Sequence, residues 1–148
     1  MAYDPIGKPS LDQFAVRPNL YDYDAMRASW SWDDLRNELD GLPGGGINKA
    51  YECVDRHVVN GRGDKPAILW EGKDGTAETY TFADMMRGSN QFANALAQLG
   101  ISKGERVFVF LDRIPELYFT VFGTLKKGCI IGPLFSAFGP EAIKDRLE

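Results

Sequence analysis

The sequence predicts an α/β protein in which a parallel β-α-β unit forms the carboxyl-terminal third of the chain. Residues 106–111 form a short, almost continuous apolar run, which is typical of a strand covered on both faces. Apolar residues then recur at helical spacing from Pro115 to Leu125, and residues 130–134 form a second apolar run. Two strands joined by a crossover helix make one unit of a parallel sheet. Because such a sheet needs more strands and helices on both faces, we expect the front part of a longer protein.

The first 29 residues and the rest of the chain have different patterns. Residues 1–29 carry scattered prolines and tyrosines without a sustained hydrophobic period, so we expect an extended amino-terminal arm. Residues 30–148 have the periodic pattern of an α/β domain. Ser31 and Asp34 resemble a capping box at the start of a short helix, and the glycine-rich residues 41–46 must form a loop.

The next part of the chain predicts a helix followed by a β-hairpin. Asn48 can cap the helix, and Asn60-Gly61 ends it. Residues 67–71 and 77–81 favour two strands, and Gly72-Lys73-Asp74-Gly75 suits the turn between them.

Two further helices are marked by their first and last residues. Thr81 and Asp84 form a capping box, after which apolar residues recur at spacings of three and four until Gly100 ends the helix. Pro115 suits the first position of the second helix, and Gly128 suits the left-handed cap at its end. The second helix is the crossover of the parallel unit.

Composition argues against several functional classes. The 148 residues carry a net charge of −4 with interspersed signs, whereas a large nucleic-acid surface needs clustered Lys and Arg. We find no secretory signal and no apolar stretch long enough to span a membrane, and we expect a cytoplasmic protein that binds neither nucleic acid nor membranes. Cys53 and Cys129 are interpreted as two reduced thiols in the core rather than a disulfide, since a chain of this size needs no covalent staple.

No residue has the sequence context of a catalytic group or a metal ligand. His57 is the only histidine, and one histidine with two distant cysteines lacks the spacing of a zinc site. A lone histidine on a helix is more often structural or at the surface than a general base. The glycines at 44–46 lack the Gly-Lys-Ser/Thr that ends a Walker-type phosphate loop. We therefore predict no catalytic residue and no metal site within these 148 residues.

One loop is marked as a candidate site, and it contains Phe135, Ser136, Ala137, Phe138 and Gly139. It follows a predicted parallel strand and opens a helix, and ligands of open α/β sheets bind at the carboxyl ends of strands. Three of its residues are small enough for close backbone approach, and the new helix offers free amides. From the residues alone, an ordinary strand-to-helix turn explains the loop equally well.

From about Trp30 onward, short motifs follow one another in an ordered series. They are Asn48-Lys49-Ala50-Tyr51, Asp55-Arg56-His57, Gly63-Asp64-Lys65-Pro66-Ala67, Trp70-Glu71-Gly72, Tyr80-Thr81-Phe82, Lys103-Gly104-Glu105-Arg106-Val107, Pro115-Glu116-Leu117-Tyr118-Phe119, Gly132-Pro133-Leu134-Phe135-Ser136-Ala137-Phe138 and Asp145-Arg146-Leu147-Glu148. The series resembles the amino-terminal portion of AMP-forming acyl-CoA synthetases, in particular acetyl-CoA synthetases and their short-chain relatives. No single motif is a catalytic signature; the order of the series makes the resemblance specific.

The resemblance implies an incomplete amino-terminal part of the large α/β domain of an adenylate-forming enzyme, with a β-hairpin, several helices and a partial parallel β-α-β sheet. It implies a ligase that activates a small carboxylic acid with ATP and Mg²⁺ to an acyl-adenylate and then transfers the acyl group to CoA. The family's phosphate loop, ribose-binding aspartate and adenylation lysine would all lie beyond Glu148. We therefore expect this chain alone to be inactive and to bind none of ATP, Mg²⁺ and CoA tightly.

For residues 135–139, the resemblance implies a wall of the channel that holds the pantetheine arm of CoA. The acetyl-CoA enzymes commonly carry a Gly-Gly pair where this chain has Ser136 and Ala137.

Two other interpretations stay open. A truncated ligase-like fold can serve as a non-catalytic interaction module. A free-standing flavodoxin-like nucleotide binder would need a complete parallel sheet within the chain, which the sequence does not contain. The open edges of a two-stranded sheet also lead us to expect self-association of the isolated chain.

Overall fold

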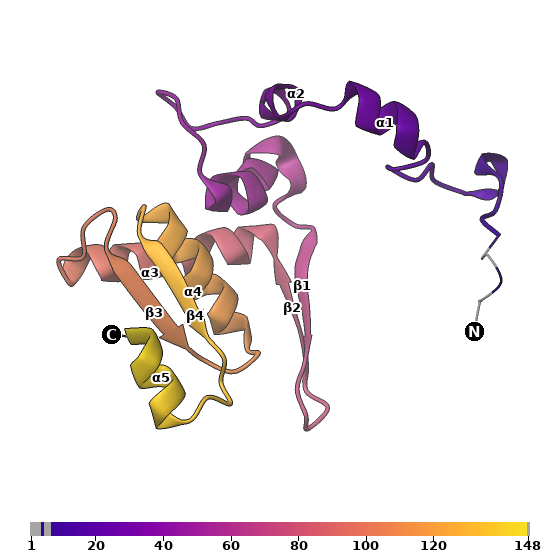
Figure 1. The fold of residues 1–148 in the computed structure, drawn as a ribbon. Coiled ribbons are helices and arrows are strands. Elements are labelled where there is room, and N and C mark those ends of the chain that lie inside the picture. The colour runs from indigo at the N-terminus through magenta and orange to yellow at the C-terminus, as the bar shows by residue number, and fades with distance from the viewer. Residues whose placement is uncertain (1–3, 5–6, 148) are drawn as a thin grey trace. The chain divides into compact units, whose positions relative to one another are not determined.

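The computed structural model describes Asp4 and residues 7–147 of the chain (Figure 1). Internal contacts divide the chain into two units, residues 1–38 and residues 39–148. The division at residue 30 that the sequence suggested stays a prediction. Residues 1–3 and 5–6 of the predicted arm lie outside the described residues.

The first unit contains three short helical segments, which are η1 (Leu11–Gln13), α1 (Tyr23–Ser29) and α2 (Trp32–Asn37). The helix α1 lies in the stretch for which the sequence suggested extended backbone. It begins after Asp22, whose side chain accepts a 2.9 Å hydrogen bond from the Ala25 amide. An N-cap of this kind is enough to start a short helix. Ser31 caps α2 as predicted, because its hydroxyl accepts a 3.1 Å bond from the Asp34 amide.

The second unit contains a helical segment at residues 49–62. The Asn48 side chain accepts hydrogen bonds from the amides of Ala50 (2.9 Å) and Tyr51 (3.3 Å), which confirms the predicted N-cap. Gly61 adopts a φ of +76° and interrupts the helix where the sequence placed its end. Much of the segment has the wide π-helical turn, in η2 (Tyr51–Asp55) and η3 (Val58–Arg62).

Both cysteines are free thiols, as predicted, but only one of them belongs to the core. Cys129 is buried, and its thiol donates a 3.3 Å hydrogen bond to the Ser102 carbonyl. Cys53 is exposed, so its assignment to the core was wrong. The buried stripe of its helix consists of Ala50 and Val54. Because the π-helical turn is wider than an α-helical one, the residue three positions after Ala50 falls beside this stripe.

The predicted hairpin is confirmed. β1 (Pro66–Glu71) pairs antiparallel with β2 (Ala77–Thr81), and the Gly75 amide closes the turn with a 3.0 Å bond to the Gly72 carbonyl. The long helix α3 (Phe82–Gln98) follows directly. Its capping box is complete, since Thr81 and Asp84 each accept a hydrogen bond from the other's backbone amide.

The predicted parallel unit is also confirmed, and it consists of β3 (Arg106–Phe110), α4 (Pro115–Lys126) and β4 (Ile130–Leu134), followed by α5 (Pro140–Leu147). The two strands pair in register from Arg106–Ile130 to Phe110–Leu134. The helices α3 and α4 pack against each other, and Figure 1 shows both on the same side of the strand pair.

None of the helices in the described part of the chain is long and apolar enough to cross a membrane.

The two faces of the parallel strand pair differ in burial. Val109 is buried, whereas its neighbours Phe108 and Phe110 are 42% and 47% exposed and Ile130 on β4 is 54% exposed. Side chains alternate between the faces of a strand, so these three residues lie on the outer face. The sequence at residues 106–111 is as apolar as that of a strand buried on both faces. Within the described residues, however, only one face of this strand is covered.

Two glycines allow the backbones of α3 and α4 to approach closely. A Cβ added at Gly123 of α4 would lie 2.7 Å from the carbonyl oxygen of Ser89 and 2.8 Å from Phe92 Cβ, both on α3. A Cβ at Gly88 of α3 would lie 2.9 Å from the ring of Phe119 on α4. At Gly123 the Ser89 backbone would have to move and at Gly88 the Phe119 ring would have to move, so both glycines serve packing rather than backbone conformation.

The substitution Gly123→Ala tests this helix contact. Alanine is the better helix former by about 1 kcal/mol, but overpacking a tight site costs about 1–3 kcal/mol. We expect net destabilisation, seen as a lower melting temperature and faster hydrogen exchange in α3 and α4. Gly139→Ala is the matched control, because a Cβ there would meet nothing within 4 Å. An unchanged melting temperature for Gly123→Ala would contradict the steric argument.

The loop before residue 48 is held by a buried carboxylate. Glu52 accepts hydrogen bonds from the amides of Gly41 (2.7 Å) and Asp40 (3.3 Å) and from the Arg56 guanidinium (2.7 Å). Burial alone would raise the pKa of the Glu52 carboxyl, but the bond from Arg56 and the two amide bonds outweigh it and lower this pKa below the usual value. The ionised form therefore ties the glycine-rich loop to the helical segment.

The lowered pKa gives this contact a defined pH dependence. A carboxyl whose pKa is lower in the folded state stabilises that state above its unfolded pKa, near 4.3, and loses this contribution as the pH falls through the folded pKa. We expect Glu52→Gln to be less stable than the parent protein at neutral pH, with the difference shrinking in acid. Melting temperatures of both proteins across this pH range provide the test. A constant difference between them would contradict the ionised role of Glu52.

Candidate functional site

The predicted loop lies at the carboxyl end of β4 and leads into α5. Its first four residues form a turn, closed by a 3.0 Å hydrogen bond from the Phe138 amide to the Phe135 carbonyl. The helix begins at Pro140, and the Ile143 amide donates a 3.2 Å bond to the Gly139 carbonyl. The loop therefore occupies the position at which open α/β sheets bind ligands.

The two aromatic residues of the loop have different surroundings. Phe138 is half-buried, with the Arg146 guanidinium carbon 4.1 Å from its ring centroid. Phe135 is 56% exposed and contacts Phe138 edge to face, with 5.6 Å between the ring centroids. Phe138 thus joins the loop to α5, whereas Phe135 presents an open aromatic surface. Arg146 itself is fixed by a 2.7 Å bond from its guanidinium to the Ala142 carbonyl.

The small residues of the loop are open to the surroundings. Ser136, Ala137 and Gly139 are exposed, and a Cβ at Gly139 would meet nothing within 4 Å. Contacts within the described residues therefore do not demand small side chains here. Close approach of a ligand to this backbone stays a prediction.

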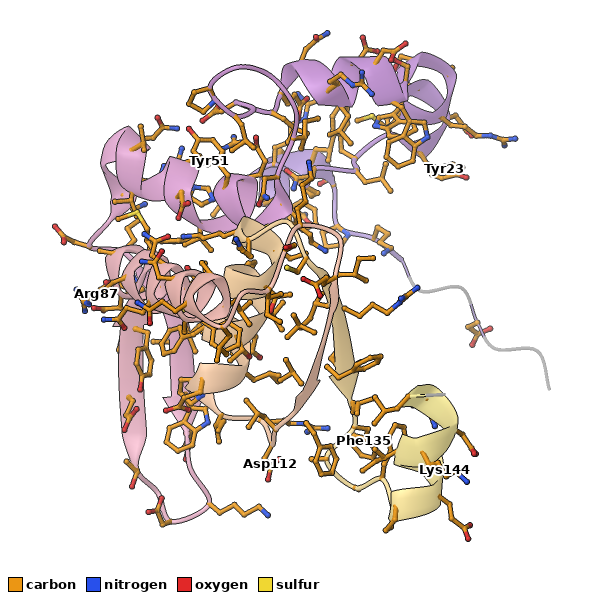
Figure 2. The ribbon with its side chains drawn as sticks, turned by 90° about the vertical axis from the view of Figure 1, so that its left-hand side faces the viewer. Tyr23, Tyr51, Arg87, Asp112, Phe135 and Lys144 are labelled. Atoms are coloured by element: carbon orange, nitrogen blue, oxygen red, sulfur yellow. The ribbon has the colours of Figure 1, made fainter. Side chains whose placement is uncertain are left out.

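A cleft of about 740 Å³ lies beside the loop, and three segments of the chain line it. The hairpin turn forms one wall, the connection between β3 and α4 forms another, and the predicted loop contributes its first two residues. The lining residues are Trp70, Glu71, Gly72, Lys73, Asp74, Asp112, Arg113, Ile114, Phe135 and Ser136. Figure 2 shows the labelled Asp112 and Phe135 at the same end of this unit as the hairpin turn.

The structure thus brings Phe135 and Ser136 to the cleft, while Ala137, Phe138 and Gly139 lie outside its lining. The sequence analysis missed the contributions of residues 70–74 and 112–114. The sequence could have indicated residues 112–114, because they follow β3 just as the predicted loop follows β4, and ligands bind at the carboxyl ends of such strands. No comparable signal existed for the hairpin turn, whose position depends on contacts between distant residues.

The cleft has a partly apolar lining of mixed charge, with two cations and three carboxylates. Asp74 accepts a 3.0 Å bond from the Thr76 amide within the hairpin turn, and this bond lowers the pKa of its carboxyl. Asp112 accepts a 2.8 Å bond from the Arg113 amide. The volume lies within the range of small-molecule sites.

Other candidate chemistry in the described residues is limited. The His57 ring packs against Phe82, with 4.7 Å between the ring centroids, which supports the structural interpretation of this histidine. Among the described residues, no group of three or more His, Cys, Asp and Glu side chains is arranged to hold a metal ion. The cleft beside Phe135 is therefore the strongest candidate site.

Comparison with known proteins identifies the family. The model of the family described as AMP-binding enzyme matches residues 55–148. The chain belongs to the AMP-binding enzyme family. An acetyl-coenzyme A synthetase of Bacillus subtilis is 42% identical over 132 residues, which cover 88% of this chain and 23% of the relative. A 3-hydroxypropionyl-coenzyme A synthetase of Metallosphaera sedula is 39% identical over 121 residues, covering 79% of this chain and 18% of the relative.

A solved structure supports the same assignment. The crystal structure of a Brucella canis acyl-CoA synthetase matches with a TM-score of 0.77 and 38% sequence identity, over 84% of this chain and 22% of that chain. The resemblance and the α/β fold class inferred from sequence are thereby confirmed. The chain spans about a fifth of the length of the curated relatives it matches.

Proposed function

We propose that the chain is the amino-terminal part of an AMP-forming short-chain acyl-CoA synthetase. The observation that carries the proposal is the exposed loop 135–139 at the carboxyl end of β4, in a fold shared with an acyl-CoA synthetase. Acetyl-coenzyme A and 3-hydroxypropionyl-coenzyme A synthetases among the relatives support a small carboxylic acid as the substrate.

The proposed reaction has two steps. A carboxylate oxygen attacks the α-phosphorus of ATP, which forms the acyl-adenylate and releases pyrophosphate. The CoA thiolate then attacks the acyl carbonyl carbon, and the bond to AMP breaks. Mg²⁺ accompanies the ATP and would neutralise phosphate charge. No group of three or more His, Cys, Asp and Glu side chains that could hold a metal ion occurs within the described residues.

In this reaction, the role of the chain is to border the path of CoA. Phe135 offers an exposed ring, and Ser136 and Ala137 leave space beside the backbone. The thioester step requires the CoA arm to reach the adenylate in an orientation that allows attack. A rigid wall of small residues serves this purpose without taking part in bond formation. Cytoplasmic location stays a prediction.

A non-catalytic interaction module is the alternative function. The observation that favours it is the apolar outer face formed by Phe108, Phe110 and Ile130, because exposed apolar patches mark surfaces that pack against another component. The same face also suits further parts of an enzyme four to five times longer, on the lengths of the relatives. Activity of the whole protein distinguishes the two functions.

The proposed function is tested by assaying both half-reactions on the whole protein. With ATP, Mg²⁺ and acetate or propionate, we expect pyrophosphate release, trapping of the adenylate as hydroxamate, and thioester formation when CoA is added. The 148-residue chain alone should give none of these signals, because charge stabilisation at a transferring phosphorus needs positioned donors. Absence of pyrophosphate release by a folded whole protein would refute the proposal and favour the interaction module.

The substitution Ala137→Trp tests the role of the loop. If Ala137 borders the CoA channel, an indole there fills space that the pantetheine arm must occupy. Overpacking of about 1–3 kcal/mol corresponds to roughly tenfold or more in rate, so thioester formation should slow by that factor and the KM for CoA should rise. Pyrophosphate exchange should change much less.

The control is the half-reaction that does not use CoA. A misfolded loop would damage both half-reactions together and would also lower the melting temperature. Equal loss in both steps, or no loss in either, would remove residues 135–139 from the site.

A further inference from the structure

The hairpin and the connection after β3 are joined by one tryptophan. The indole N–H of Trp70, near the end of β1, donates a 2.9 Å hydrogen bond to the main-chain carbonyl of Arg113. The two residues are 43 positions apart in sequence. Both line the cleft beside Phe135 and Ser136. This bond therefore links two walls of the candidate site directly.

The indole is also seated against the hairpin turn. A Cβ added at Gly72 would lie 2.9 Å from Trp70 Cη2 and 2.7 Å from an Asp74 carboxylate oxygen. Gly72 does not have a positive φ, so the glycine is needed for contact with these side chains rather than for the turn conformation. Trp70 is half-buried, and its ring is held from one side while its N–H points to Arg113.

Among the described residues, the segment that accepts this bond is otherwise held by local hydrogen bonds. Residues 112–114 are irregular. Three local hydrogen bonds hold them: Ile114 N–H to the Asp112 carbonyl (2.9 Å), the Leu117 amide to the Ile114 carbonyl (3.1 Å) and the Arg113 amide to Asp112 Oδ1 (2.8 Å). Local bonds fix the shape of this segment but not its distance from the hairpin. The Trp70 bond constrains that distance directly, in addition to the edge-to-face contact between Tyr80 on β2 and Phe119 on α4 (5.5 Å between ring centroids).

We propose that Trp70 is a positioning residue that sets the separation between the hairpin turn and residues 112–114, and thereby shapes the cleft through which CoA reaches Phe135 and Ser136. The inference rests on the proposed function, since it concerns the CoA-dependent step of that reaction. Trp70 touches no reacting atom in this role. Its effect passes through the position of the Arg113 main chain.

The test uses two variants of the whole protein that disturb this contact in different ways. Trp70→Phe keeps an aromatic ring but removes the N–H donor, and Gly72→Ala keeps the donor but displaces the ring. Both should raise the KM for CoA by about three- to tenfold, the range produced by the loss of one hydrogen bond. The KM for ATP, the KM for acetate and the rate of pyrophosphate exchange should stay unchanged.

Leu69→Ala is the matched control on the same strand. Leu69 is 77% exposed, and side chains of adjacent strand residues point to opposite faces. This variant should leave every kinetic constant unchanged. Hydrogen exchange should in addition be faster at residues 112–114 in Trp70→Phe than in Leu69→Ala, and this readout does not depend on activity.

The outcomes separate the two proposals. If the unaltered whole protein forms no CoA thioester, the proposed function fails irrespective of the variants, and the inference about CoA fails with it. If the protein is active but Trp70→Phe and Gly72→Ala leave the KM for CoA unchanged, only the inference fails, even if exchange at residues 112–114 increases. A parallel loss of both half-reactions with lower melting temperature would also overturn it, because that result describes a purely structural tryptophan.

Discussion

The close contact between α3 and α4 determines where the other elements of the second unit can lie. Gly123 brings the two helix backbones together, Gly88 makes room for the Phe119 ring, and Ser89 and Thr124 are fully buried in the same region. These two hydroxyls are satisfied within their own helices, by the carbonyls of Met85 (2.6 Å) and Thr120 (2.7 Å). No polar group of this pair therefore needs a partner from the other helix, and small side chains can fill the contact.

Two polar contacts attach the helical segment 49–62 to the end of this helix pair. The Asn48 amide group donates a 2.8 Å bond to the Leu125 carbonyl in the last turn of α4, which also accepts a 3.0 Å bond from the Gly128 amide. Lys126 reaches Asp55 (2.6 Å) on the segment and Asn90 (2.7 Å) on α3. Asn48 thus caps its own helix and also bonds the last turn of α4, so a single side chain couples local structure to packing.

The sequence predicted those elements whose causes are local. The capping box of Thr81 and Asp84, the cap at Asn48 and the hairpin turn each depend on residues a few positions apart, and the structure has all of them. The helix α1 was missed because its apolar residues are exposed and give no stripe; the only signal was Asp22. The π-helical turns and the exposure of Cys53 were missed because periodicity was measured against an α-helix.

The candidate site was predictable in part for the same reason. The loop 135–139 follows from the order strand, loop, helix, and residues 112–114 follow from the same rule one strand earlier. The hairpin wall of the cleft could not be predicted in this way, because nothing near Trp70 in the sequence indicates that its N–H donates to the Arg113 carbonyl. Likewise, Gly72 looks like a turn residue, but its contact with the indole shows a packing requirement. Contacts across 43 positions are a property of the fold and not of a window of sequence.

These attachments explain how residues outside the cleft can influence its shape. α4 begins directly after the Asp112–Ile114 segment and ends just before β4. The packing of α4 on α3 therefore influences where the carboxyl end of β3 and the amino end of β4 lie. The hairpin is held through its junction with α3 at Thr81, through Trp70 and through the contact of Tyr80 on β2 with Phe119 on α4. The cleft lies where these two supports meet. Its shape therefore depends on their relative position, and a change in either support alters the cleft even when Phe135 and Ser136 keep their own conformation.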